Sequence, residues 1–276
     1  MKTIKVMLAA AAAMMVSASC GSTDAAPKVL VLYYSQTSNT KTVAQEIATR
    51  TGADIEEIVP VKPYDGDFQA TISRSMQERE QGVTPELKPL NADLSKYDVI
   101  FLGYPIWFGT YAPPIATFLA QADLSGKKVV PFCTFGSGGL DTSVRDLTEK
   151  LPGATILPGY GVRAARMAAV PGEVDQFLKA GGFIEGEYTP LDPFPAQHPV
   201  SDEEAAILQI AIGDYPMLSA QAKTVAQRTI PGGKEYLFTA VDTPRGGGQQ
   251  APPSGEIKVY VTILDGEAPV FTQVLR

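Results

Sequence analysis

The chain has very few of the side chains from which metal centres and disulfide bridges are built. Its 276 residues include one histidine, His198, and two cysteines, Cys20 and Cys133. A metal site of the histidine and cysteine type has almost no ligands to draw on, so no metal is expected. Because the N-terminal segment described below uses Cys20, no disulfide within the chain is expected. His198 stands in a proline-rich stretch, which favours an exposed linker histidine over a catalytic one.

A block of positive charge is also missing. The formal net charge is −7, and no cluster of lysine and arginine appears along the chain. Proteins that bind nucleic acid carry such clusters, so nucleic acid is excluded as a partner. The acidic balance favours neutral or cationic partners instead. With 45% hydrophobic and 19% charged residues, the composition is typical of a globular protein.

The N-terminus has the pattern of a targeting segment. Lys2 and Lys5 precede an apolar run over residues 6–16, and the small residues 17–19 lead directly to Cys20. The run is too short to span a membrane and is typical of a secretory signal peptide over residues 1–20. A cysteine in this place resembles a bacterial lipobox, in which the thiol of Cys20 is acylated and the chain is cut before it. We expect an exported protein, lipid-anchored to the cell envelope membrane and facing the periplasm or the surface. The alternative is an ordinary signal peptide with an incidental cysteine.

Strand and helix patterns alternate five times over residues 28–183. Continuous apolar runs predict strands that are buried on both faces, and stripes at helical spacing separate them. A strand containing charges, over residues 55–61, suits the edge of a sheet. The other predicted strands are residues 28–34, 99–102, 128–133 and 155–157. The long connection over residues 62–98 is expected to contain a polar helix at 68–80. The alternation predicts an α/β fold with a doubly wound, five-stranded parallel sheet that binds ligands at the carboxyl ends of its strands.

The pattern changes after this domain. Residues 184–200 are rich in proline and turn formers and are predicted to be a linker. Residues 201–276 predict a second, smaller α+β domain. Its helical stretches fall within 202–226, a flexible loop covers 246–254, and its strands are expected at 235–241, 257–264 and 270–275.

Three loops that follow predicted strands carry the chemistry. The first, residues 35–40 (the hydroxyl loop), places four hydroxyl side chains and an asparagine at a helix start, where free N–H groups and the helix dipole attract a phosphate. A well-capped helix is the alternative explanation. The second loop holds the only tryptophan, whose flat ring can stack on a planar ligand. The third, residues 134–139 (the glycine loop), lets backbone approach a ligand closely.

Four segments in the same order resemble the flavodoxin-like family, in particular its bacterial branch often found as lipoproteins. They are residues 34–40, 100–107, 125–134 and 136–138. The resemblance implies that FMN is the cofactor and that the hydroxyl loop holds its phosphate. It also implies that the second and third loops flank the isoalloxazine ring. Two departures stand out: Phe108 replaces a second tryptophan, and the glycine loop is about one residue shorter than usual.

The cofactor-binding residues implied by this resemblance are Ser35, Gln36, Thr37, Ser38, Asn39, Thr40, Pro105, Ile106, Trp107, Phe108, Gly109, Thr134, Phe135, Gly136, Ser137 and Gly138. No catalytic side chain is expected, because the flavin itself carries the chemistry. Cys133 is expected to be a small buried core residue. Arg163 and Arg166 are expected to be surface arginines.

The sequence therefore favours an FMN-binding redox protein, either an electron carrier or a small flavin-dependent oxidoreductase, with an unidentified redox partner. The first alternative is a binding lipoprotein on a flavodoxin scaffold that has lost its flavin, since a fold alone does not fix function. A third class is a protease inhibitor acting through the C-terminal domain, whose helix-then-strands order is faintly similar to cystatins. Residues 227–232 do not match the inhibitory motif of true cystatins, so inhibition is not carried over.

Overall fold

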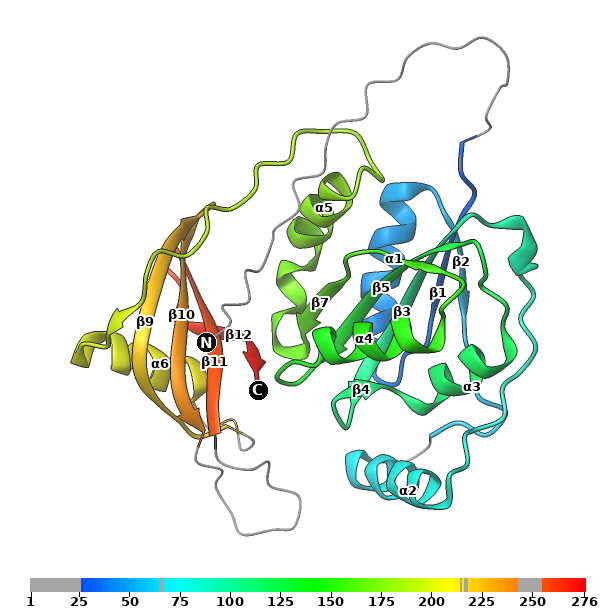
Figure 1. The fold of residues 1–276 in the computed structure, drawn as a ribbon, viewed down its shortest axis with the longest axis horizontal. Coiled ribbons are helices and arrows are strands. Elements are labelled where there is room, and N and C mark those ends of the chain that lie inside the picture. Colours follow the sequence, from blue (N-terminus) through cyan, green and yellow to red (C-terminus); the bar gives the residue numbers. More distant parts are fainter. Residues whose placement is uncertain (1–25, 65–66, 214, 216–217, 243–254) are drawn as a thin grey trace, which may run out of the picture.

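The computed structural model describes residues 26–64, 67–213, 215, 218–242 and 255–276 (Figure 1). The predicted signal peptide, Cys20 and the predicted loop 246–254 lie outside the described residues. Among the described residues, no helix combines the length and apolar character needed to cross a membrane.

The first domain is built on a parallel sheet. Its strands are β1 (Val29–Tyr33), β2 (Asp54–Glu57), β3 (Val99–Trp107), β5 (Lys128–Phe135), β6 (Thr155–Ile156) and β7 (Tyr160–Arg163). Their order is β2-β1-β3-β5, and β6 and β7 both pair with β5, at its beginning and its end. The predicted doubly wound α/β fold is confirmed, with β2 at an edge as expected.

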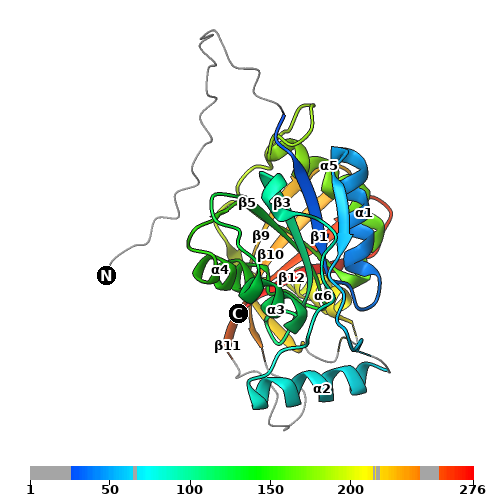
Figure 2. The same ribbon diagram turned by 90° about the vertical axis from the view of Figure 1, so that its right-hand side faces the viewer.

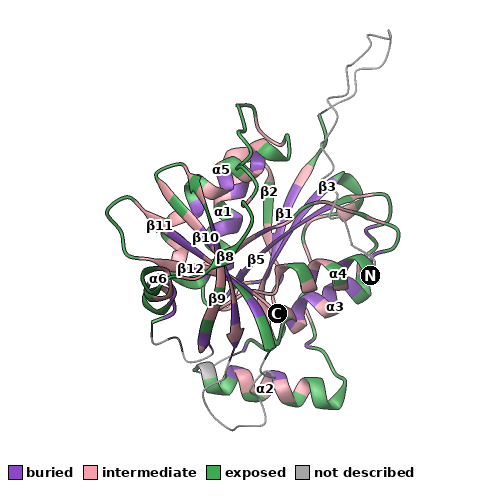
Figure 3. Cartoon of the chain, turned by 60° about the vertical axis from the view of Figure 1, so that its left-hand side comes forward, coloured by how far each residue is buried: buried purple, intermediate pink, exposed green. Residues whose placement is uncertain are grey.

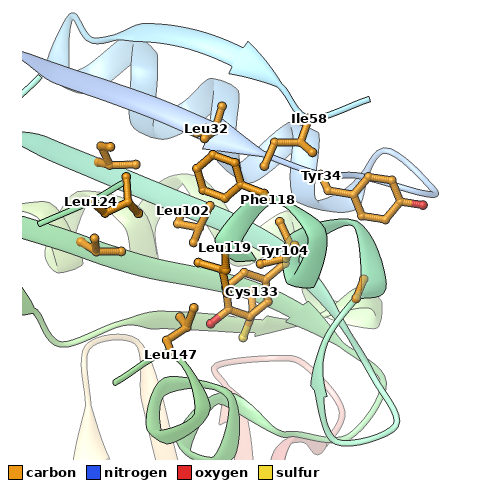
Figure 4. Close-up of a cluster of buried hydrophobic side chains, with 14 of the residues drawn as sticks. Leu32, Tyr34, Ile58, Leu102, Tyr104, Phe118, Leu119, Leu124, Cys133 and Leu147 are labelled. Atoms are coloured by element: carbon orange, nitrogen blue, oxygen red, sulfur yellow. The ribbon is translucent and has the colours of Figure 1, made fainter. Parts of the chain in front are cut away.

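Both faces of this sheet are buried because its strands alternate between two cores. In β1, Leu30 and Leu32 belong to one hydrophobic cluster, whereas Val31 belongs to the other. Helices α1 (Asn39–Thr51) and α5 (Val170–Ala180) cover one face. Helices α3 (Pro113–Gln121) and α4 (Leu140–Lys150) cover the other, where Cys133 lies buried, as expected (Figure 4).

Helix α2 (Phe68–Gln81) is the polar helix expected in the long connection between β2 and β3. Figure 2 shows that it lies apart from the sheet and from the helices that cover it. Most of its residues are exposed or half-buried, in contrast to the buried central strands (Figure 3). A short 3-10 helix, η1 (Leu94–Lys96), precedes β3.

The last strand of the parallel sheet differs from the expectation. The sequence predicted one short strand over 155–157, but β6 ends at Ile156 and the chain pairs again as β7. Pro158 lies between them, and proline has no N–H to donate to a ladder. The second half of the strand carries Arg163 to the ligand edge, where it is buried. The expectation that Arg163 is a surface residue is therefore wrong. A second 3-10 helix, η2 (Ala164–Ala169), leads on to α5.

The second domain is an antiparallel sheet with one helix. Helix α6 (Asp202–Ile212) begins with a capping box formed by Ser201 and Glu204. The strands are β8 (His198–Pro199), β9 (Ala220–Ile230), β10 (Gly233–Asp242), β11 (Gly255–Leu264) and β12 (Val270–Leu275), in the order β12-β11-β10-β9-β8. Leu208 and Ile212 of α6 pack into the core of this sheet. The cystatin likeness stays a prediction.

The helical stretches expected within residues 202–226 are limited to the first part of that range. Helix α6 ends at Ile212, and residues 220–226 belong to β9. Gly213 ends the helix with a positive φ of 48°. Strand β9 pairs with β10 along most of its length, so pairing with the neighbouring strand decides its conformation.

Candidate functional site

The three predicted loops meet at the carboxyl edge of the parallel sheet and border one cleft of about 1540 Å³. From the hydroxyl loop, Gln36, Thr37 and Asn39 line it. All the predicted residues of the other two loops also line it: Pro105, Ile106, Trp107, Phe108, Gly109, Thr134, Phe135, Gly136, Ser137 and Gly138. Ser35, Ser38 and Thr40 are not part of its lining.

The hydroxyl loop forms the start of α1. Ser38 takes up a left-handed conformation, with φ of 65°, and its side chain makes no capping bond. The Lys41 amide donates to Ser35 Oγ at 3.2 Å, and Asn39 Nδ2 donates to Thr37 Oγ1 at 3.4 Å. Both hydroxyl oxygens are acceptors in these bonds, so their own protons remain available to a ligand. The first N–H groups of a helix have no partner within it, so the loop is rich in donors and suits an anion.

Thr40 lies beneath this loop. Its side chain is buried, and Thr40 Oγ1 lies 2.9 Å from Thr134 Oγ1 of the glycine loop. The bond joins two of the three loops directly. The structure therefore gives Thr40 a partner inside the protein, whereas Thr37 is exposed on the cleft.

The second loop is shorter than expected because β3 continues as far as Trp107. It turns back through Phe108 and Gly109 into β4 (Thr110–Tyr111), and Trp107 pairs with Thr110. The two central residues have φ of 51° and 85°, the pattern of a type I′ hairpin turn. A positive φ is uncommon for phenylalanine. The Phe108 side chain is 44% exposed at the cleft.

Trp107 belongs to an aromatic cluster that the sequence analysis missed. Its ring lies edge-on to Tyr34 and Tyr64, with centroids 6.0 Å and 5.1 Å away. Gln36 Nε2 donates to the Tyr64 carbonyl at 2.6 Å, which ties the cluster to the hydroxyl loop. Burial raises the pKa of both tyrosines, with a hydrogen bond to Glu78 adding to the shift for Tyr64, so both phenols are neutral at pH 7. The contacts with Tyr34 and Tyr64 hold Trp107 at the carboxyl edge of the sheet.

Helix α2 forms one wall of the cleft and is fastened by Arg74. The Arg74 guanidinium lies 4.0 Å from the Tyr64 ring centroid, and its Nε is 2.8 Å from Glu78 Oε1. Its Nη1 donates to the Pro63 carbonyl at 2.6 Å. The lining residues of this wall are Asp67, Gln69, Thr71, Ile72, Met76, Arg79 and Glu80. The sequence predicted the helix but carried no signal that it borders the site.

The opposite wall comes from the second domain. Tyr215, Val274, Leu275 and Arg276 line the cleft beside the glycine loop. The Val274 amide donates to the Ser137 carbonyl at 2.6 Å. No local pattern in the sequence could reveal this wall, because the contact joins residues more than 130 positions apart.

Comparison with known proteins gives consistent findings. A family model described as flavodoxin matches residues 28–169. A curated relative from Gluconacetobacter diazotrophicus, named NAD(P)H dehydrogenase (quinone), is 33% identical over 138 residues. The match covers 45% of this chain and 65% of that relative, which is less than two thirds of its length.

Two solved structures are also similar. One is a protein of Bacteroides uniformis, described provisionally as a flavoprotein, with 31% identity and a TM-score of 0.49 over 54% of this chain and 98% of that one. The other is a flavoprotein of Lactobacillus acidophilus in complex with FMN, with 27% identity and a TM-score of 0.47 over 55% of this chain and 98% of that one.

Proposed function

The chain belongs to the flavodoxin family of flavin-binding proteins, and from this premise we propose that its cleft binds FMN and that the protein is a small flavin-dependent oxidoreductase. When bound, the flavin supplies the redox chemistry. The residues of the chain bind it, orient it and control what reaches it. Three features of the cleft support the proposal.

The donor set of the hydroxyl loop fits a phosphate. It offers helix N–H groups and the hydroxyl of Thr37, which lines the cleft, together with the hydroxyl of Ser35 in the same loop. The oxygens of both hydroxyls are already oriented by bonds within the loop. Ser38 adds a third, exposed hydroxyl. Hydrogen-bond donors located at the N-terminus of a helix stabilise a bound negative charge, so no lysine or arginine is required in the loop.

The hairpin and the glycine loop fit a planar ring. Trp107 is fixed by the two tyrosines, and the glycine loop brings backbone groups to the cleft without intervening side chains at Gly136 and Gly138. The bond between Thr40 and Thr134 sets the spacing of the phosphate end and the ring end.

One observation favours an oxidoreductase over an electron carrier: the cleft has walls on both sides. Helix α2 borders one side, and Tyr215 with residues 274–276 borders the other. A volume of about 1540 Å³ exceeds the roughly 300–1,000 Å³ of a typical small-ligand site, which leaves room for a second small molecule. The name of the Gluconacetobacter relative supports a nicotinamide nucleotide as reductant and a quinone as acceptor.

We also propose that the mature chain is exported and anchored through an acylated Cys20. The support is the sequence pattern of residues 1–20. Two acyl chains hold a protein stably on a membrane, whereas one gives only reversible binding.

The deciding experiment is FMN binding by the chain without residues 1–20. Purified apoprotein is titrated with FMN and followed by calorimetry and by the visible spectrum. We expect stoichiometric binding at micromolar concentration, then reduction of the bound flavin by NADH or NADPH under anaerobic conditions. Absence of binding at micromolar FMN would instead support the binding-lipoprotein alternative.

A further inference from the structure

Arg163 is a buried cation that links the two domains. Only 9% of its surface is exposed. Its Nε donates to the Gly136 carbonyl of the glycine loop at 2.7 Å, and its Nη1 donates to the Phe271 carbonyl of β12 at 3.1 Å. The guanidinium also lies 3.4 Å from the centroid of the Phe271 ring. One side chain therefore holds the backbone of the glycine loop and the backbone of the C-terminal sheet at once.

No carboxylate pairs with this charge among the described residues. Two carbonyl oxygens and the rings of Phe271 and Tyr215 surround it instead, and burial lowers its pKa. A buried charge without an ionic partner is unfavourable unless its hydrogen bonds are well made. Arg163 thus keeps its place through its contacts with the loop and the strand.

The loop and the strand also touch through their backbones. The Val274 amide donates to the Ser137 carbonyl at 2.6 Å. A Cβ atom built on Gly138 would lie 2.4 Å from the Val274 carbonyl oxygen, so only glycine permits this approach. On the other side of Ser137, a Cβ atom on Gly136 would lie 2.7 Å from the Tyr215 hydroxyl. The glycines of this loop make room for the second domain as well as for a ligand.

We propose that strand β12 is part of the cofactor site, with Arg163 as the positioning residue that holds the glycine loop against it. The proposal rests on the proposed function, in which this loop flanks the flavin ring. A loop with glycines at 136, 138 and 139 has many conformations when unsupported. Holding the glycine loop against β12 before the ligand binds lowers the entropic penalty of binding. The C-terminal domain thereby increases flavin affinity.

The first test compares Arg163→Ala and Arg163→Lys with Arg166→Ala. Arg166 is a matched control, because it lies three residues further on and its guanidinium pairs with Glu173 at 2.5 Å. We expect Arg163→Ala to weaken FMN by about tenfold to a hundredfold, since it loses hydrogen bonds from a charged group. Arg163→Lys keeps the charge with fewer donors and should lose less. Arg166→Ala should bind as the wild type does.

Riboflavin separates this role from a phosphate contact. Arg163→Ala should weaken riboflavin and FMN by the same factor, because the glycine loop faces the ring that both ligands share. If the wild type binds FMN and Arg163→Ala binds each ligand as tightly as the wild type does, the inference is wrong. If wild type itself binds no FMN, the proposed function fails instead.

A second measurement needs no substitution. Binding at one site must stabilise the contacts that favour it, so FMN should slow hydrogen exchange of the Val274 amide and its neighbours in β12. The turn between β9 and β10 serves as the internal control, with no change expected, because a Cβ atom built on its Gly232 would meet nothing within 4 Å. Unaltered exchange in β12 at saturating FMN would overturn the inference, even if the Arg163 variants fail to fold.

Discussion

The hydroxyl oxygens of Thr40 and Thr134 lie 2.9 Å apart in the interior, although 94 residues separate them in the chain. Thr40 belongs to the first turn of α1, and Thr134 lies near the end of β5. Their bond connects the loop that fits a phosphate with the loop that fits a ring. Thr40 therefore has a partner inside the protein, whereas Thr37 of the same loop lines the cleft.

Thr40→Val should destabilise the protein by about 1–3 kcal/mol. Valine keeps the shape of threonine but leaves the buried Thr134 hydroxyl without its partner. Thr148→Val is the control, because Thr148 is an exposed threonine in α4, and surface changes stay within about 0.5 kcal/mol. Urea unfolding of the apoprotein measures both. Equal losses in the two variants would show that the Thr40–Thr134 bond does not stabilise the fold.

Ser35→Ala combined with Thr37→Ala should weaken FMN on the order of a hundredfold or more. In the proposed site each hydroxyl donates to a phosphate that is largely dianionic at pH 7, and hydrogen bonds to charged groups contribute ~1.5–3 kcal/mol each. Riboflavin, which lacks the phosphate, should lose much less. Thr42→Ala is the matched control, since the Thr42 hydroxyl donates to the Ser38 carbonyl at 3.1 Å. Titration calorimetry with both ligands measures the effect, and an equal loss for both would place the phosphate elsewhere.

Trp107→Ala should weaken FMN and riboflavin alike, by about tenfold, because stacking acts on the ring and aromatic pairs contribute about 0.5–1.5 kcal/mol beyond their buried area. Trp107→Phe keeps an aromatic ring against Tyr34 and Tyr64 and should lose less. Tryptophan fluorescence of the wild type should be quenched on binding, and Trp107 is the only tryptophan that can report it. Unchanged fluorescence at saturating flavin would contradict a ring beside Trp107.

Cys133 should resist thiol reagents in the folded protein. Complete burial raises the pKa of its thiol well above the ordinary value of about 8.5. At pH 8, iodoacetamide should label the chain without residues 1–20 only after unfolding in urea, as followed by mass spectrometry. Rapid labelling without urea would show that the β5 core opens.

The same pKa shift gives a pH dependence of stability. Because the folded state raises the thiol pKa, its contribution is complete below the unfolded pKa of about 8.5 and is lost as the pH rises above that value. The wild type should therefore lose more stability between pH 7 and pH 10 than Cys133→Ala does. Urea midpoints at the two pH values measure the difference, and parallel losses would contradict it.

Cys20→Ala should release the protein from the membrane fraction or block its processing. The cysteine follows the small residues that end the apolar N-terminal run, and its thiol is the proposed site of acylation. Cell fractionation and mass analysis of the mature N-terminus measure the outcome. Ser19→Ala changes a neighbouring small residue and should leave processing intact. A Cys20→Ala protein that is processed and membrane-bound like the wild type would contradict the anchor.

The sequence by itself determined the parallel sheet and the loops at its carboxyl edge. Apolar runs such as residues 99–102 and 128–133 form strands that are buried on both faces, because apolar side chains point to both sides of such a strand and both sides must be removed from water. Once these strands are parallel, the loops that follow them must meet at one edge. Trp107 and the glycine loop are therefore placed at one edge of the sheet by the sequence alone.

Only the tertiary structure decided what encloses that cleft. Arg163 reaches the Phe271 carbonyl across 108 residues of sequence, and the Val274 amide reaches the Ser137 carbonyl of the glycine loop. Neither contact leaves a periodic or compositional trace, since periodicity reports which face of an element is buried and not which element covers it. The direction of the Thr40 hydroxyl is likewise set by Thr134. The physical reason is the same in each case: local patterns fix elements, whereas the walls of the site depend on contacts between residues far apart in the chain.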